Sequence, residues 1–144
     1  MNIDSILNGV VIDHIKAGRS MQIYHLLGLD QLDCPVALIT NAHSGKMGRK
    51  DIIKVDSENV DIDLDIIAII DPEATVNIIR DGQLVEKKNL ALPLEIRDVL
   101  KCKNPRCITS VEQDLVHVFR LTDKKSGTYR CLYCETQAEK RFNR

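Results

Sequence analysis

The chain has 144 residues, a formal net charge of −1 and 44% hydrophobic residues, enough for one domain or two small ones with an apolar core. Aromatic residues make up only 3%, so we expect a core of Ile, Val and Leu. The sequence has no apolar run of about 18 residues and no secretory signal at its N-terminus, which argues against a membrane protein and favours a cytoplasmic one.

Charge is distributed unevenly along the chain. Residues 1–100 carry 10 Lys and Arg against 16 Asp and Glu, a net charge of −6, whereas residues 101–144 carry 10 against 5, a net charge of +5. This asymmetry favours two domains with different roles and a boundary near Leu100. We assign residues 1–93 to the first domain and residues 94–144 to the second.

The first domain alternates between strand and helix patterns. Strands rich in β-branched residues are predicted at 9–15, 35–40, 51–55, 75–79 and 84–88. A helix is predicted at 19–29, with Ser20 as its N-cap. Residues 59–70 fit both the strand and the helix pattern, because their apolar residues alternate with aspartates and also share one helical face. We expect a helix capped by Ser57. Asp81-Gly82 tolerates positive φ, which predicts a hairpin turn at 80–83.

This order of elements is the ferredoxin-like split βαβ pattern with one added hairpin strand. We therefore predict an α+β fold, in which an antiparallel sheet packs against two helices. The second domain is expected to begin with a short helix at 94–100, after Pro93, and to continue with strands at 115–121 and 128–131. It is predicted to be a small all-β domain built around four cysteines.

Those four cysteines form two close pairs. Cys102 and Cys107 are spaced C-x4-C, Cys131 and Cys134 are spaced C-x2-C, and 23 residues separate the pairs. Two such pairs complete the tetrahedral, all-sulfur site that structural Zn²⁺ prefers, and four thiolates leave no open position for catalysis. Two disulfides or four inert thiols are the alternatives, but disulfides suit an oxidising compartment. We therefore predict one structural zinc that supplies much of the folding free energy of this small domain.

A basic stretch stands out in the acidic first domain. Lys46, Arg49, Lys50 and Lys54 place four positive charges within nine residues, and Lys87 and Lys88 lie on the last predicted strand. These cations could hold phosphates, or they could be a solvated edge that blunts strand pairing. No phosphate-loop motif for nucleotide hydrolysis occurs.

Other candidate site residues are few. Asp13 and His14 are adjacent on a predicted strand, so they point to opposite faces and can face one ligand only where the strand bulges or ends. Cys34, the fifth cysteine, is expected to be a buried structural thiol. These residues do not assemble a catalytic apparatus.

Several short motifs occur in a fixed order along the chain. They are G-V-V-I-D-H-I at 9–15, S-G-K-M-G-R-K-D-I-I-K at 44–54, A-T-V-N at 74–77 and L-P-L-E-I at 92–96, followed by the two cysteine pairs. Together they resemble the regulatory chain of aspartate carbamoyltransferase along nearly its whole length. The resemblance implies a non-catalytic subunit in pyrimidine biosynthesis. Its N-terminal domain would bind CTP and ATP and pair with another regulatory chain, and its zinc domain would contact the catalytic chain.

The resemblance also assigns site residues. The nucleotide effector site would contain Asp13, His14, Lys50, Lys54, Asn77, Ile79 and Lys87, together with Ile3, Asp4 and Ile6 of the N-terminal segment. His14 and Lys87 would face the phosphates, and Asp13 and Lys54 would face the ribose and base. Residues that flank the cysteines are predicted to contact the catalytic chain: Asn104, Arg106, Tyr133 and Glu135. A tyrosine of one family member aligns with Gly82 of this chain.

Two alternatives remain open at this point. A zinc-ribbon protein that binds nucleic acid would suit the net charge of +3 that the second domain keeps with zinc bound. Its few aromatic residues argue against base stacking, and we expect no nucleic-acid or membrane partner. A small nucleotide-using enzyme is the other alternative.

Overall fold

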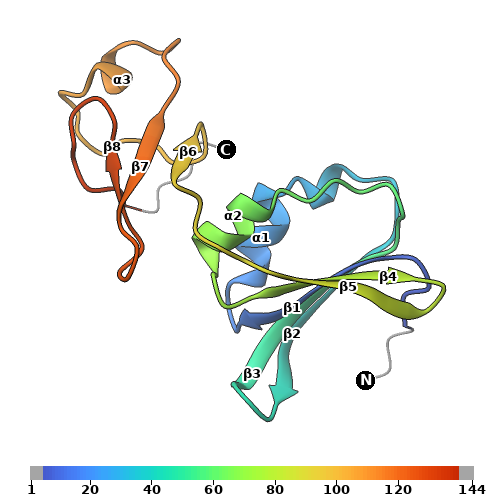
Figure 1. The fold of residues 1–144 in the computed structure, drawn as a ribbon. Coiled ribbons are helices and arrows are strands. Elements are labelled where there is room, and N and C mark those ends of the chain that lie inside the picture. The colour runs from blue at the N-terminus through green and yellow to red at the C-terminus, as the bar shows by residue number, and fades with distance from the viewer. Residues whose placement is uncertain (1–4, 140–144) are drawn as a thin grey trace. The chain divides into compact units, whose positions relative to one another are not determined.

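Five strands form one antiparallel sheet in the first part of the chain (Figure 1). The computed structural model describes residues 5–139 and divides the chain into two units, residues 1–91 and 92–144. The elements of the first unit are β1 (Gly9–Lys16), α1 (Ser20–Leu26), a 3-10 turn η1 (Leu29–Gln31), β2 (Val36–Ser44), β3 (Gly48–Val55), α2 (Leu64–Ile70), β4 (Thr75–Arg80) and β5 (Gln83–Asn89).

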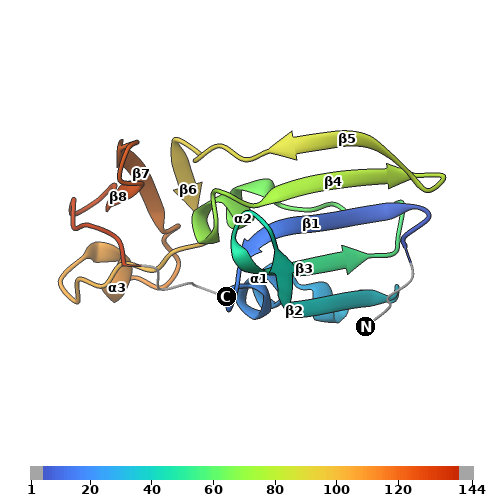
Figure 2. The same cartoon turned by 90° about the horizontal axis from the view of Figure 1, so that it is seen from below.

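The strand order is β2-β3-β1-β4-β5, so the predicted ferredoxin-like sheet with one added strand is confirmed. The helices α1 and α2 cover one face of this sheet, and Figure 2 views the opposite face. The core between the helices and the sheet is aliphatic, as the composition predicts. Its best-buried members are at most 1% exposed and include Ile12, Ile53 and Val76 of the sheet and Ile23 and Ile66 of the helices.

One buried carboxylate fixes two irregular parts of this unit. Asp51 on β3 is 0% exposed. It accepts hydrogen bonds from Gly18 N–H (3.1 Å), Ser20 N–H (3.3 Å), Ser20 Oγ (2.6 Å) and Asn41 N–H (3.0 Å). Asn41 has a φ of 58° and lies where the pairing of β2 with β3 shifts register. Asp51 therefore ties the turn before α1 to the bulge in β2, and such a bulge bends its strand.

Both helix caps expected from the sequence are wrong. Arg19 is the N-cap of α1 and makes no side-chain cap hydrogen bond, because the Ser20 hydroxyl is bonded to Asp51 inside the unit. The second helix covers only Leu64–Ile70 of the expected 59–70, because the Asp63 side chain accepts the backbone N–H groups that start it. An Asx cap of this kind satisfies donors that the first helical turn leaves unpaired.

The second unit is a three-stranded antiparallel sheet with long loops. Its elements are β6 (Glu95–Arg97), a single helical turn α3 (Ile108–Val111), β7 (Val118–Asp123) and β8 (Thr128–Cys131), and the strand order is β6-β7-β8. The helix expected at 94–100 is wrong, because Ile96 instead pairs with Phe119 of β7 and both are almost fully buried. No helix in residues 5–139 is long and apolar enough to cross a membrane.

Candidate functional site

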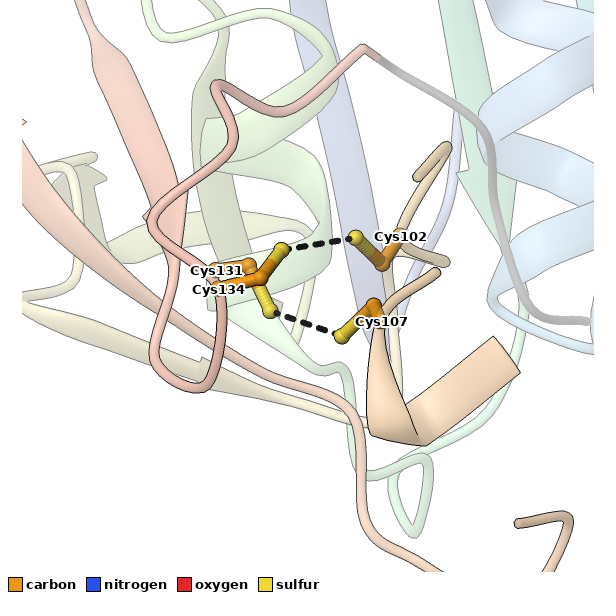
Figure 3. Close-up of side chains that lie close together, drawn as sticks. All are labelled: Cys102, Cys107, Cys131 and Cys134. Carbon is orange, nitrogen blue, oxygen red and sulfur yellow. Dashed lines mark hydrogen bonds between the residues drawn. The ribbon is translucent and has the colours of Figure 1, made fainter. Parts of the chain in front are cut away.

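The four predicted metal ligands come together in the second unit (Figure 3). Cys102 and Cys107 lie on the loop before α3, Cys131 ends β8, and Cys134 follows in the next turn. Their Sγ atoms all lie within 4.8 Å of one another, with 3.6 Å from Cys102 to Cys134 and 3.7 Å from Cys107 to Cys131. A tetrahedral site with Zn–S bonds of about 2.3 Å requires sulfurs about 3.8 Å apart. The donor set and its spacing therefore fit Zn²⁺.

Burial and hydrogen bonding give these thiols different acidities. Burial raises the pKa of Cys102 to about 12 and also raises the pKa of Cys131. Burial acts in the same direction on Cys134, but hydrogen bonds with Thr136 and Asn104 outweigh it and lower the pKa of this thiol to about 6. A divalent cation among the sulfurs would hold all of them as thiolates at neutral pH.

Asn104 organises the loop that carries the first two sulfurs. Its carbonyl accepts hydrogen bonds from Cys107 N–H (3.1 Å) and Ser110 Oγ (2.6 Å), and its side-chain Oδ1 accepts from Arg106 N–H (3.0 Å). Its Nδ2 donates to Thr136 Oγ1 at 3.4 Å, next to the second cysteine pair. The half-buried Asn104 thus links the two halves of the cluster, while Arg106 is exposed.

In the described part of the chain, five exposed apolar side chains flank the thiol cluster. Each is between 37% and 66% exposed: Ile108, Val111, Val116, Leu132 and Tyr133. The first two follow Cys107 on α3, and Leu132 and Tyr133 stand between Cys131 and Cys134. The Tyr133 hydroxyl donates to the carbonyl of Val116 at 3.1 Å, which joins two of these segments. These flanking apolar residues and the exposed Glu135, which has a φ of 62°, place accessible and partly apolar surface next to the cluster.

A second candidate site lies on the open face of the first unit, opposite the helices (Figure 2). Lys54 on β3 pairs with Val11 on β1, Val11 pairs with Asn77 on β4, and Asn77 pairs with Lys87 on β5. Directly paired residues share a face of a sheet, so these side chains form one row across four strands. The Asn77 Oδ1 is buried and has no hydrogen-bond partner within residues 5–139. The amide of Asn77 therefore has unused capacity for a ligand.

The strand bulge required for Asp13 and His14 to face one ligand is present. The pairing of β1 with β3 shifts between Ile12 and Ile15, and His14 has a φ of 57°, which breaks the alternation of faces. The His14 Nδ1 lies 3.0 Å from Thr75 Oγ1, and Thr75 pairs with Asp13 across the sheet. Both side chains therefore reach the open face.

Asp13 is held ionised beside His14. Its Oδ1 lies 2.9 Å from Lys50 Nζ and accepts the His14 N–H at 2.6 Å. Burial raises the pKa of the Asp13 carboxyl, but the hydrogen bonds from Lys50 and the His14 backbone and the positive charge of Lys50 outweigh it and hold the pKa below its usual value of 3.8. The charge of Lys50 is therefore compensated by Asp13, which leaves Lys50 less available to an anion.

A cavity of about 390 Å³ opens at the His14 end of this face. Its polar and charged lining residues are His14, Lys46, Glu73, Thr75, Lys87 and Asn89. His14 and Lys87 are predicted site residues, and Lys46 belongs to the basic stretch that the sequence offered for phosphates, but the resemblance did not assign Lys46, Thr75 or Asn89 to the effector site. Thr75 and Asn89 stand two residues from Asn77 and Lys87 on their strands, so strand periodicity alone could have found them.

The other predicted effector residues are distributed as follows. Ile3 and Asp4 lie outside the described residues. Ile79 continues the open face two residues beyond Asn77, and Ile6 is half-buried. Gly82 has a φ of 75° and donates its N–H to the Leu7 carbonyl at 2.8 Å. A ligand contact at Gly82 would therefore use its carbonyl, because its N–H is occupied.

Two family models and several curated relatives match this chain. The model described as the aspartate carbamoyltransferase regulatory chain, allosteric domain, matches residues 1–91, and the model of the metal binding domain of that chain matches residues 94–142. The aspartate carbamoyltransferase regulatory chain of Clostridium tetani is 49% identical over 135 residues, which is 94% of both chains. That of Clostridium acetobutylicum is 50% identical over 136 residues, covering 94% of this chain and 92% of the relative.

A more distant relative matches over the same length. The aspartate carbamoyltransferase regulatory chain of Bifidobacterium longum is 42% identical over 139 residues, which is 96% of this chain and 99% of the relative. The two family models together span nearly all of the sequence, and the four cysteines in the region of the metal-binding model converge on one point in the structure. The chain therefore belongs to the aspartate carbamoyltransferase regulatory chains, as a non-catalytic allosteric chain with a metal-binding domain and as part of that enzyme complex.

Proposed function

We propose that this chain senses nucleotides for an aspartate carbamoyltransferase. Residues 1–93 bind CTP and ATP on the open face of the sheet, and residues 94–144 hold one structural Zn²⁺ and dock on the catalytic chain. A second regulatory chain pairs with it through the first domain. The complex acts in the cytoplasm at the start of pyrimidine biosynthesis, and the five cysteines, all within the described residues and none in a disulfide, suit that reducing compartment.

The row of Lys54, Asn77 and Lys87 on the open face is the observation that carries the effector site. The cationic cavity at its end, with His14 and Lys87, suits phosphates by charge. Lys54 offers a hydrogen-bond donor and the ionised Asp13 offers acceptors to a ribose and a base. The sheet thus presents recognition groups for each part of a nucleotide on one surface.

The sulfur-only donor set supports zinc as the bound metal. Thiolates select Zn²⁺ over the hard cations Mg²⁺ and Ca²⁺, and a closed set of four sulfurs is typical of structural zinc. The metal fixes the two short loops from which the flanking apolar residues, Arg106 and Glu135 project. A rigid, partly apolar surface of this kind supports docking on another chain.

Pairing of two regulatory chains is supported by the edges of the sheet. The strands β2 and β5 lie at the two ends of the strand order, and within residues 5–139 each has one side without a neighbouring strand. Leu84 and Val85 on β5 are more than half exposed. Exposed edges with apolar side chains favour association with a second copy.

Calorimetric titration of the zinc-loaded chain with CTP and with ATP tests the effector site. We expect saturable binding of both nucleotides and about tenfold weaker binding by Lys87→Ala, because one charge-assisted contact to phosphate is removed. Lys88→Ala is the matched control, because Lys88 pairs with the buried Val76 and so lies on the helix side of the sheet. Absence of heat with either nucleotide, or equal losses in the two variants, would refute the site.

Removal of the metal tests the docking role. A thiol-reactive mercurial should displace the metal from a reconstituted complex and release the catalytic chains, still active, on gel filtration. The displaced metal, measured by a colorimetric chelator, should be one Zn²⁺ per regulatory chain. A complex that stays intact after complete metal removal would disprove docking through the metal-binding domain.

A further inference from the structure

The cavity beside His14 contains a lysine from an element outside the assigned effector site. Lys46 comes from the turn between β2 and β3, whereas Lys87 comes from β5 at the other edge of the sheet. The two lysines therefore approach the same cavity from opposite sides of the open face. His14 and Thr75 lie between them on the central strands β1 and β4.

The fold bends the β2–β3 hairpin toward this cavity. Asn41 interrupts the pairing of β2 with β3, and its N–H is held by the buried Asp51. A bulge bends a strand, and Figure 1 shows the turn end of the hairpin on the side of the sheet that the helices leave open. The turn itself is fixed, because Met47 N–H donates to Ser44 Oγ at 3.1 Å and Gly48 adopts a φ of 76°. Lys46 is thus carried on an ordered turn.

The charge of Lys46 has no partner in the described part of the chain. Neither Lys46 nor Lys87 forms an ion pair within residues 5–139, whereas the nearby Lys50 is paired with Asp13. Glu73 is the carboxylate that lines the cavity, so the two lysines leave an excess of positive charge there. Cations on two sides of one cavity, with a net excess of positive charge, favour an anionic ligand long enough to reach both of them.

We propose that Lys46 contacts the phosphate chain of the nucleotide and sets the preference of this site for triphosphates over monophosphates. The inference rests on the proposed effector site and adds a second lysine, opposite Lys87, that clamps the same group. A nucleoside triphosphate carries several charged oxygens in a row, so it can reach both lysines, whereas a monophosphate reaches only one side of the cavity. Lys46 thus discriminates between nucleotides by the number of their phosphates, whereas other residues of the open face recognise the base and the ribose.

The test compares CTP with CMP by calorimetric titration of the full, zinc-loaded chain. Lys46→Ala should weaken CTP binding roughly 5- to 10-fold, the loss of one charged contact, and should change CMP binding less than about 2-fold. Lys46→Arg should retain most of the affinity for CTP, because it keeps the charge. Lys125→Ala is the matched control for net charge, because Lys125 is exposed on a turn of the second unit.

The outcomes separate this inference from the effector site itself. If Lys46→Ala binds CTP as tightly as wild type while Lys87→Ala is weakened, the effector site stands and the role of Lys46 is refuted. Equal weakening of CTP and CMP by Lys46→Ala also refutes it, because Lys46 would then not respond to phosphate number. A wild-type chain that binds neither nucleotide refutes the effector site as well as this inference. Circular dichroism of each variant establishes that the fold is unchanged.

Discussion

Asp51→Asn tests the buried carboxylate on which the shape of the first unit depends. Asp51 Oδ2 accepts three hydrogen bonds, from Gly18 N–H, Ser20 N–H and Ser20 Oγ, and Oδ1 accepts a fourth from Asn41 N–H. An asparagine keeps one acceptor oxygen and replaces the other with a donor. Even in its better orientation, the amide nitrogen then faces the N–H of Asn41. Losing one hydrogen bond to a charged acceptor and leaving one buried donor unpaired costs about 3 kcal/mol of unfolding free energy.

Urea unfolding of the zinc-loaded chain, followed by circular dichroism, measures this cost. For an m-value of about 2 kcal/mol/M, the midpoint of Asp51→Asn should fall by about 1.5 M. Asp63→Asn is the matched control, because Asp63 caps α2 at an exposed position where asparagine caps equally well, so its midpoint should barely change. A stability of Asp51→Asn within about 0.5 kcal/mol of wild type would refute the reasoning.

The difference in unfolding free energy between wild type and Asp51→Asn should depend on pH, and the direction of this dependence follows from the pKa of Asp51. Burial raises the pKa of the Asp51 carboxyl, but the hydrogen bonds from Ser20, Asn41 and Gly18 outweigh it and hold the pKa below the usual value of 3.8. The contribution of the carboxylate is therefore fully present above pH 3.8 and is lost as the pH falls through the folded-state pKa. The difference between wild type and Asp51→Asn should narrow over that range, and a difference that widens would contradict the assignment.

Three further predictions concern the metal cluster and the packing of the first strand. Cys107→Ser should lose the bound metal and the protection of residues 92–144 from protease, whereas Cys34→Ser, outside the cluster, should keep one metal per chain by colorimetric assay. Acidification from neutral pH to about pH 5 should release the metal, because protons compete for the thiolates, and dialysis with metal analysis measures the loss. Gly9→Ala should lower the unfolding free energy by about 2 kcal/mol, because its Cβ would overlap the Val55 carbonyl oxygen, whereas Gly45→Ala meets no atom within 4 Å and should be neutral in urea unfolding.

Strand alternation and helical spacing were sufficient to predict the five strands and the first helix of the first unit, because local sequence and burial agree there, whereas residues 59–70 fitted both patterns and only Leu64–Ile70 is helical. The alternation of Val10, Ile12 and their neighbours reports directly on a strand with one buried face. The bulge at Asp13-His14 could not be predicted from the sequence, which showed only that a bulge was needed for both side chains to face one ligand. The positive φ at His14 accompanies a contact with Thr75, which is 61 positions further along the chain. Long-range pairing of this kind leaves no local pattern.

The prediction failed where tertiary pairing overrides local propensity. Leu94–Leu100 looked helical after Pro93, but Ile96 is buried against Phe119 of β7, and that pairing decides the structure. The expected cap Ser20 failed for a related reason, because its hydroxyl bonds to Asp51, which is distant in sequence. The cysteine pairs were informative despite this, because metal coordination constrains ligand identity and spacing more tightly than propensity constrains a short strand.

The small size of the second unit explains why surface for a partner can lie beside the metal. Residues 92–144 are too few to bury a large core, and Leu100, Phe119 and Tyr129 supply much of the core they have. A metal that crosslinks the loops would replace part of that core, so apolar residues such as Val111 and Leu132 can stay exposed and available for the proposed docking. Loss of metal should therefore remove the fold of this unit and its docking surface together. The proposed effector face has its own sheet and core, so Cys107→Ser should still bind nucleotide with nearly wild-type affinity while it no longer associates with the catalytic chain.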